Sequence, residues 1–168
     1  MTMNTPDHTP PADEPRPVER WFASYSNDHR NATNQAIHVV CVPLILWSVI
    51  ALLWLIPVPP ALGREGAWAG MAMAMAAIYY YRLSRPLGLV MALKLVALGF
   101  ITHGLYVALG ATQLLWLAIA VFVVAWIGQF IGHRYEGKKP SFFTDLVYLL
   151  IGPAWVMGKL MRRLRVPL

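Results

Sequence analysis

Long apolar runs alternate with short polar segments along most of this chain. Four such runs lie at residues 39–56, 67–81, 87–109 and 111–131. A helix needs about 20 apolar residues to cross the ~30 Å hydrocarbon core of a bilayer. The second run is shorter than that and rich in Ala and Met. We nevertheless predict four membrane-spanning helices.

The segment before the first run has a different pattern. Residues 1–17 hold five of the thirteen prolines and almost no apolar side chains, which favours a disordered tail. Residues 18–37 are polar and aromatic, as is typical of a helix at the membrane surface. Trp21, Phe22 and Tyr25 are expected to anchor it at the interface.

The segment after the fourth run predicts one more helix. Residues 142–157 are apolar but short, and Gly152 and Pro153 interrupt them. We expect a re-entrant or interfacial helix here. The predicted fold is therefore all-α: an integral membrane bundle of four spans plus this short C-terminal helix, in one domain covering residues 18–168.

Composition and charge agree with a membrane protein. Hydrophobic residues make up 58% of the chain and charged residues 13%, about half the usual ~25%. Cys41 is the only cysteine, which excludes a disulfide scaffold. The net charge of +6 does not indicate nucleic-acid binding, because the basic residues lie between apolar runs.

Those basic residues predict an orientation. In a four-span arrangement, twelve Lys and Arg residues lie on the side of both termini, and Arg64 alone lies opposite. By the positive-inside rule, both termini should be cytoplasmic. In a bacterium the membrane would be the inner one.

Three histidines are expected at one membrane face. His38 begins the first span, His133 ends the fourth, and His29 lies just before the first span on the same side. Neutral imidazoles favour Fe, Zn, Cu or Ni over Mg or Ca. The alternative is three unrelated interfacial histidines.

Two other polar residues lie within the third span. His103 is about sixteen residues from its cytoplasmic end, roughly 24 Å deep at 1.5 Å per residue, so we expect it not to share a metal with His38 and His133. Lys94 either meets an acidic lipid or substrate headgroup or extends its amine to the cytoplasmic face.

Amides precede His38 at helical spacing. Asn27, Asn31, Asn34 and His38 would line one face of a continuous helix, where the amides could support a ligating histidine or simply cap the helix. His29 is half a turn away from His38 on such a helix. If both bind one metal, the chain must turn between them, near residues 30–33.

Two acidic residues follow His133. Glu136 or Asp145 could complete a site of two histidines and one carboxylate. Either could instead accept a hydrogen bond from a ligating histidine, or pair with Lys138 and Lys139.

Two blocks of the sequence resemble the signature blocks of the 2-hydroxy fatty acid dioxygenase family. They read YSNDHRNATNQAIHVVCVPLI and WIGQFIGHRYEGKKPSFFTDLVYLLIGPAW. The matching residues are His29, Asn31, Asn34, His38 and Pro43, then Gln129, Gly132, His133, Glu136, Pro140, Asp145 and Pro153.

The resemblance implies a non-haem Fe(II) enzyme of lipid metabolism. Such an enzyme uses O2 to shorten a 2-hydroxy fatty acid by one carbon, in fatty-acid alpha-oxidation. His29, His38 and His133 would then be the metal ligands, and the fatty-acid chain would lie among the spans.

Two other classes of function stay open. One is a different membrane metalloenzyme that acts on lipids, although the HExxH motif of zinc proteases and the paired histidine boxes of di-iron desaturases are absent. The other is a non-enzymatic membrane protein such as a small transporter, for which we see neither internal repeats nor charges gathered at mid-membrane.

Overall fold

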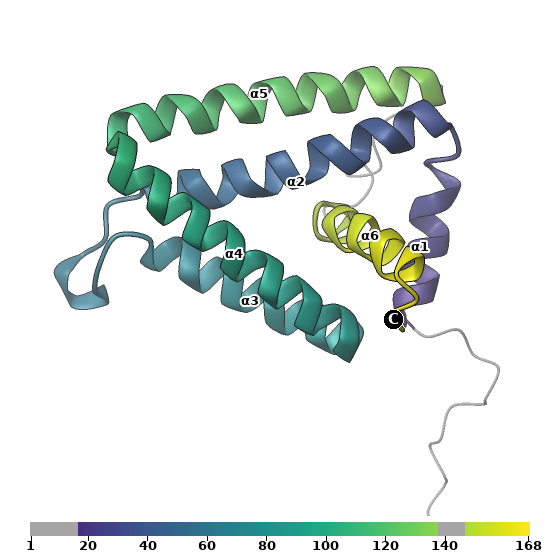
Figure 1. The fold of residues 1–168 in the computed structure, drawn as a ribbon, viewed down its shortest axis with the longest axis horizontal. Coiled ribbons are helices and arrows are strands. Elements are labelled where there is room, and N and C mark those ends of the chain that lie inside the picture. The colour runs from purple at the N-terminus through teal and green to yellow at the C-terminus, as the bar shows by residue number, and fades with distance from the viewer. Residues whose placement is uncertain (1–16, 138–146) are drawn as a thin grey trace, which may run out of the picture.

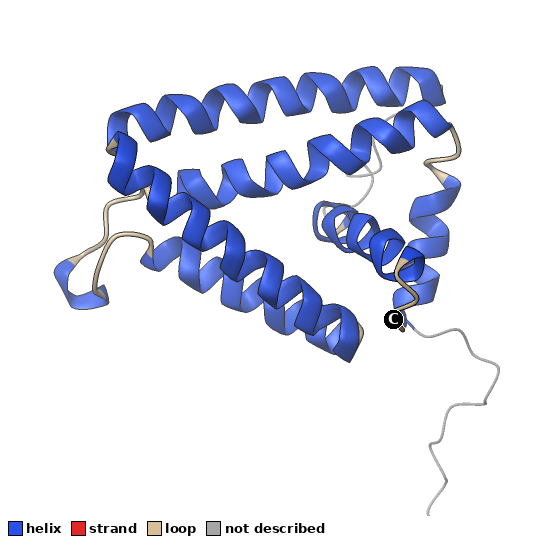
Figure 2. Cartoon of the chain, viewed as in Figure 1, coloured by secondary structure: helices blue, strands red, loops and turns tan. Residues whose placement is uncertain are grey.

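The computed structural model describes residues 17–137 and 147–168, and in these ranges the chain is helical (Figure 1). Figure 2 shows no strand in them, which confirms the predicted all-α class. The elements are α1 (Pro17–Asn27), α2 (Ala32–Trp54), the 3-10 turn η1 (Pro60–Leu62), α3 (Ala67–Leu83), α4 (Arg85–Leu109), α5 (Ala111–Glu136) and α6 (Tyr148–Arg163).

Helices α2 and α5 run antiparallel side by side (Figure 1) and make the most extensive contact between helices in the described residues. Two glycines four residues apart on α5 let the helices approach closely, as small residues do in membrane helix pairs. A β-carbon at Gly128 would lie 2.7 Å from Cys41 Sγ, and one at Gly132 would lie 2.5 Å from Asn34 Oδ1. The antiparallel pairing brings the start of α2 to the end of α5.

Helices α3 and α4 form a second antiparallel pair, inclined to the first (Figure 1). Ser84 separates them, and Gly110, at φ 78°, makes the sharp turn from α4 into α5. Glycine suits that turn because a β-carbon strains a positive φ. After the α3–α4 pair, the chain thus comes back to α2 through α5.

Three helices, namely α2, α4 and α5, are long and apolar enough to cross a membrane. Helix α3 is apolar but has only 17 residues, about 26 Å at 1.5 Å per residue. Three candidate spans are therefore present in the described residues, and a fourth span through α3 stays a prediction.

Helices α1 and α6 pack together at the end of the bundle where α2 starts (Figure 1). Their buried contact is formed by Phe22 and Tyr25 of α1 with Ile151 and Trp155 of α6. Gly158 gives Phe22 the space to lie against the α6 backbone. This contact between α1 and α6 lies beside the turn that joins α1 to α2.

The predicted single helix over residues 18–37 is wrong. Helix α1 ends at Asn27, the chain turns over residues 28–31, and α2 begins at Ala32. Asn31 caps α2, since its Oδ1 accepts bonds from the backbone N–H groups of Thr33 (2.9 Å) and Asn34 (3.2 Å). The turn expected near residues 30–33 is present, although it lies at residues 28–31, and the continuous stripe of amides on one helical face does not exist.

Two other predictions lie partly outside the described residues. Pro17, placed in the tail by its composition, is the first residue of α1, and residues 1–16 are not described. The C-terminal helix corresponds to α6, which is described from Tyr148 to Arg163, whereas residues 138–146, with Asp145, lie outside the described residues.

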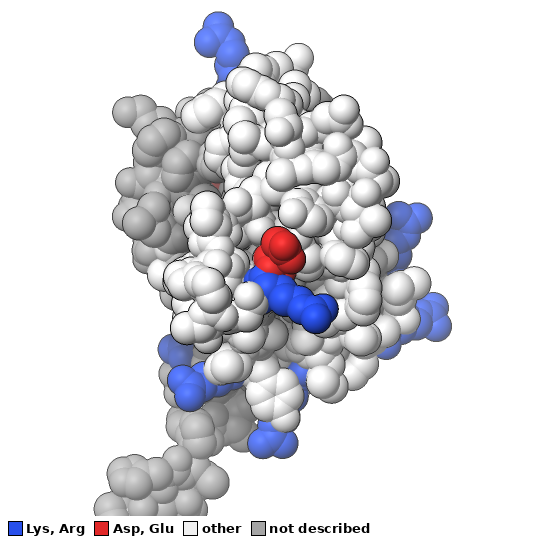
Figure 3. All heavy atoms as spheres, turned by 90° about the vertical axis from the view of Figure 1, so that its left-hand side faces the viewer, with Lys and Arg blue, Asp and Glu red and all other residues white. Residues whose placement is uncertain are grey.

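The surface at the far end of the bundle carries little charge. Figure 3 looks at that end, where the α2–α3 link and the α4–α5 turn lie, and shows mostly uncharged residues, with an acidic and a basic side chain near the centre and other basic side chains around the rim. In sequence, Arg64 and Glu65 are the charged residues of the α2–α3 link. This distribution agrees with the predicted bias of basic residues toward the opposite end.

Candidate metal centre

Three histidines from separate parts of the chain converge where α2 begins and α5 ends. His29 comes from the α1–α2 turn, His38 from the second turn of α2 and His133 from the last turn of α5. One nitrogen of each lies within 4.8 Å of the others, and all three side chains are buried. This is a group of the kind that can hold one metal ion.

The hydrogen bonds of two histidines determine which ring nitrogen carries the proton. His29 Nδ1 lies 2.7 Å from the Tyr25 carbonyl oxygen, and His38 Nδ1 lies 2.9 Å from the Asn34 carbonyl oxygen. A carbonyl only accepts, so both Nδ1 atoms donate. In the neutral rings, both Nε2 atoms then present lone pairs.

Those two lone pairs face each other, with 3.1 Å between His29 Nε2 and His38 Nε2. Two unprotonated nitrogens repel at this distance unless a cation lies between them. Nitrogens that each bind one ion at about 2.0–2.1 Å come to lie roughly 3 Å apart. The donor set therefore fits a metal such as iron or zinc.

His133 completes the group from the opposite helix. Its ring centroid lies 5.0 Å from those of both His29 and His38. Its Nδ1 is buried and has no hydrogen-bond partner among the described residues. A buried nitrogen without a partner is costly, and a metal ion would satisfy it.

Aromatic packing orients His29. Its ring stacks on Tyr25 at 4.0 Å between centroids and 8° between planes, and Trp155 packs beside both rings. Burial lowers the pKa of His29, although its hydrogen bond to the Tyr25 carbonyl and the nearby Asp28 oppose that shift. The neutral, ligating form of His29 is thereby favoured.

Glu136 binds the turn that carries His29. Its carboxylate accepts from the backbone N–H of Arg30 (2.8 Å), the backbone N–H of Asn31 (2.9 Å) and Asn34 Nδ2 (2.9 Å). It is not part of the histidine group. The structure thus favours the supporting role over that of a direct ligand.

A second connection holds the same turn from α6. Gln35 Nε2 donates to the His29 carbonyl oxygen at 2.7 Å, and Lys159 Nζ donates to Gln35 Oε1. The Lys159 ammonium also lies 4.2 Å from the centroid of the Trp155 ring. Burial, and to a lesser degree Arg162, lowers the pKa of Lys159. Sequence analysis assigned no role to Gln35 or Lys159, because nothing in the chain order indicates that α6 reaches this turn.

Two other candidates lie apart from the histidine group. His103 packs against Trp54, the last residue of α2, at 5.7 Å between ring centroids. Trp54 is sixteen residues from His38, about 24 Å along the helix, so His103 is too far away to share a metal ion with the three histidines, as predicted. Lys94 is half-buried on α4 and does not line the cavity beside the histidines. Its predicted contact with substrate finds no support.

An apolar cavity of about 370 Å³ opens beside the three histidines. Helices α2, α5 and α6 line it, with the side chains Val42, Ile45, Leu46, Val49, Phe122, Trp126, Gln129, Tyr148, Leu149 and Leu150. On α2 the lining runs from His38 to Val49, about 16 Å at 1.5 Å per residue. A narrow apolar space with nitrogen ligands at one end suits a molecule with a polar head and a hydrocarbon chain.

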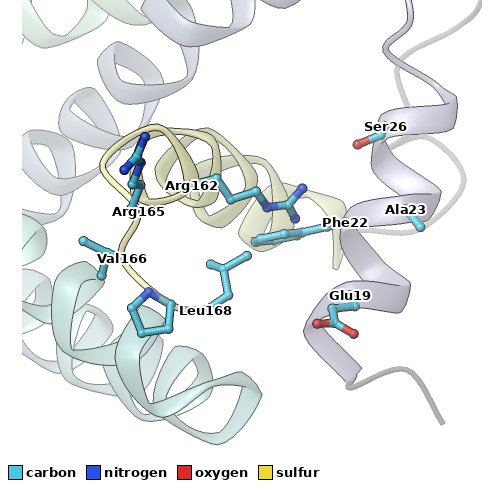
Figure 4. A pocket seen from close by; sticks show the side chains of 9 residues that line it. Glu19, Phe22, Ala23, Ser26, Arg162, Arg165, Val166 and Leu168 are labelled. Carbon is cyan, nitrogen blue, oxygen red and sulfur yellow. The ribbon is translucent and has the colours of Figure 1, made fainter. Parts of the chain in front are cut away.

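A larger hollow of about 650 Å³ lies between α1 and the C-terminal residues, away from the histidines. Figure 4 shows Glu19 and Phe22 on one side of it and Arg162 and Arg165 on the other. It is wide, open and lined by both signs of charge. We therefore place the candidate site at the smaller cavity, where the possible metal ligands are.

Comparison with known proteins identifies the family of this chain. The profile of a family described as 2-hydroxy-palmitic acid dioxygenase Mpo1-like matches residues 16–164. The 2-hydroxy-palmitic acid dioxygenase MPO1 of Saccharomyces cerevisiae is 28% identical over 142 residues, which cover 83% of this chain and 77% of the yeast protein. No solved structure shows a significant match. With a family match that extends from α1 to the end of α6, the chain belongs to the Mpo1-like family.

Proposed function

We propose that this protein is an iron-dependent dioxygenase that shortens 2-hydroxy fatty acids by one carbon. The observation that carries the proposal is the pair of facing Nε2 atoms of His29 and His38, beside His133, at the end of an apolar cavity. The name of the yeast relative supports the substrate class.

The reaction balances with O2 as the only oxidant. A 2-hydroxy acid R–CH(OH)–COOH and one O2 give R–COOH, CO2 and H2O. The bond between the carboxyl carbon and C2 breaks, C2 is oxidised to the new carboxyl carbon, and O2 is reduced. No further reductant is needed.

Each part of the site has a distinct task in this proposal. His29, His38 and His133 would hold Fe(II), which supplies Lewis-acid polarisation and a place for O2 and the substrate head to meet. Residues along α2 and α5 hold the acyl chain and exclude water. Glu136, Asn31 and Asn34 keep the α1–α2 turn in place, so that His29 stays aligned with His38.

In this proposal, the polar end of the site faces the cytoplasm and its apolar part lies in the bilayer. The histidine end would lie at the cytoplasmic face with both termini, and the cavity would extend from it into the bilayer beside Val42 and Val49. The acyl chain would then lie parallel to α2, as the surrounding lipid chains do.

Purified protein in detergent provides the test. We expect about one iron per chain after loading under nitrogen. On admission of O2, the 2-hydroxy acid should disappear and the acid with one carbon fewer should appear in equal amount, as measured by mass spectrometry. His29→Ala, His38→Ala and His133→Ala should each lose iron and activity, whereas His103→Ala should keep both.

Other results would point elsewhere. Zinc with hydrolysis of a lipid ester would indicate a different metalloenzyme, and no bound metal would indicate a non-enzymatic protein. Iron retained by His29→Ala but lost by His103→Ala would contradict the ligand set. Folding of each variant must be checked, because losing a metal can unfold its site.

A further inference from the structure

Gln129 is a polar side chain buried in an otherwise apolar wall. It lies on α5 and is 5% exposed. It lines the cavity one helical turn before His133, so both side chains face the same side of α5. No hydrogen bond joins its side chain to any residue that the structure describes.

A carboxamide carries two donor hydrogens and one acceptor oxygen. The amide atoms of Gln129 are not among the fully buried polar atoms and are accessible from the cavity that the residue lines. A molecule that fills the cavity would remove them from water, and leaving them unpaired would then be unfavourable. The neighbouring lining residues on α2 and α5, such as Val42, Ile45 and Trp126, are apolar or aromatic. The partner of the amide therefore belongs to the molecule in the cavity.

Three other polar side chains at this end of the cavity have assigned contacts, whereas His133 Nδ1 is buried without a hydrogen-bond partner among the described residues and is left to the metal ion. His29 and His38 use their Nδ1 atoms on backbone carbonyls, and the hydroxyl of Tyr148 is bonded to Ser24 Oγ at 2.7 Å. Gln129 lies on the path from the histidines to the apolar part of the cavity. In a bound fatty acid, Gln129 would therefore lie next to the carbon atoms that join the polar head to the hydrocarbon chain.

We propose that Gln129 recognises the 2-hydroxyl group of the substrate and so selects 2-hydroxy acids over unsubstituted fatty acids. This inference rests on the proposed function. A hydroxyl both donates and accepts, which matches a neutral carboxamide. An unsubstituted acid would leave the amide buried without a partner, and sites built to bind a hydroxyl strongly reject analogues that lack it.

Equilibrium binding without turnover tests this. Iron-loaded protein under nitrogen is titrated with a 2-hydroxy acid and with the unsubstituted acid of the same chain length. Wild type should bind the 2-hydroxy acid at least tenfold more tightly. Gln129→Met, which is nearly isosteric, should reduce that ratio several-fold by weakening only the 2-hydroxy acid, with iron content unchanged.

Gln113→Met is the matched control, since Gln113 is exposed near the other end of the same helix. It should leave both affinities unchanged. If Gln129→Met does not fold, Gln129→Asn keeps the carboxamide one methylene shorter and should give a ratio below that of wild type.

The outcomes separate the two proposals. If wild type binds both acids equally or neither, the proposed substrate class fails. If wild type discriminates and the folded Gln129 variant discriminates equally, Gln129 is not the determinant. Loss of iron from Gln129→Met would overturn the inference in favour of a structural role.

Discussion

At the scale of single residues, the site depends on side chains that set the position of other side chains. Glu136 is the strongest case, because one carboxylate accepts three hydrogen bonds from the α1–α2 turn and the start of α2. Hydrogen bonds to a charged acceptor are stronger than neutral ones. The position of His29 relative to His38 thus depends on a residue outside the metal-binding group.

We expect Glu136→Gln to weaken metal binding by about 10–100-fold, as the loss of outer partners of a metal site does. The new amide nitrogen cannot accept the backbone N–H that one carboxylate oxygen accepts now. Metal retained against a chelator of known affinity measures the effect. Glu65→Gln, an exposed acid in the α2–α3 link, should behave as wild type; equal retention by both variants would contradict the prediction.

The lowered pKa of His29 predicts how stability depends on pH in the metal-free protein. The unfolded chain takes up a proton on this histidine near pH 6.5, whereas the folded chain resists it because the ring is buried. The unfolded state therefore binds more protons, and stability falls as the pH is lowered below about 6.5.

Thermal unfolding of metal-free protein in detergent between about pH 7.5 and 5, on either side of the ordinary histidine pKa of about 6.5, checks this. His29→Gln should show a smaller loss of stability over that range. An identical pH dependence in both proteins would show that His29 does not resist protonation in the folded state.

At the scale of the elements, the contact between α2 and α5 determines the spacing of the histidines. Gly128 and Gly132 bring α5 against Ile37, Cys41 and Asn34 of α2. Gly132 is adjacent to His133 in sequence, and Asn34 is one turn before His38. The separation of the two helices therefore sets the separation of the two rings.

Gly132→Ala should push the helices apart, because its β-carbon would lie 2.5 Å from Asn34 Oδ1. Overpacking of this kind costs about 1–3 kcal/mol, and here it should also reduce metal content. Thermal stability and iron content of the purified variant are the measurements. Gly104→Ala, with no atom within 4 Å of its β-carbon, is the control and should be neutral in both.

At the scale of the whole molecule, the antiparallel pairs determine the topology in the membrane. Helix α2 starts and α5 ends at the histidine end, so both flanking segments lie on one side. Helices α4 and α5 are joined by a tight turn at Gly110 at the other end. Because both segments lie on one side, the number of crossings is even, so α3 must cross the bilayer if α4 does.

Single cysteines in a Cys41→Ser background test this topology. We expect Arg163→Cys and Arg82→Cys to react with an impermeant thiol reagent from the cytoplasmic side, and Arg64→Cys from the opposite side. Inside-out and right-side-out vesicles give the two measurements. Labelling of Arg82→Cys from the same side as Arg64→Cys would show that α3 does not cross.

The pattern of apolar residues by itself predicted the helical class and the main candidate spans. The predicted runs at 87–109 and 111–131 correspond to α4 and α5, because burial in lipid requires long uninterrupted apolar sequence. The order of the spans also placed His38 and His133 at one end, since helices that cross a membrane in opposite directions bring distant residues to equal depth. His29 could join them only through a turn, which the half-turn offset predicted.

Only the tertiary structure decided what surrounds those histidines. Sequence spacing put Asn31 and Asn34 on one helical face, whereas Asn31 ends the turn as a cap and Asn34 binds Glu136. The contacts of Gln35 with Lys159 and the position of Gln129 in the cavity wall depend on how α6 and α5 pack on α2. Periodicity along one helix predicts which residues share a face of that helix. A hydrogen bond between residues about a hundred positions apart depends instead on how closely two helices approach each other. That distance is determined by the small residues at the contact and by the packing of the whole bundle.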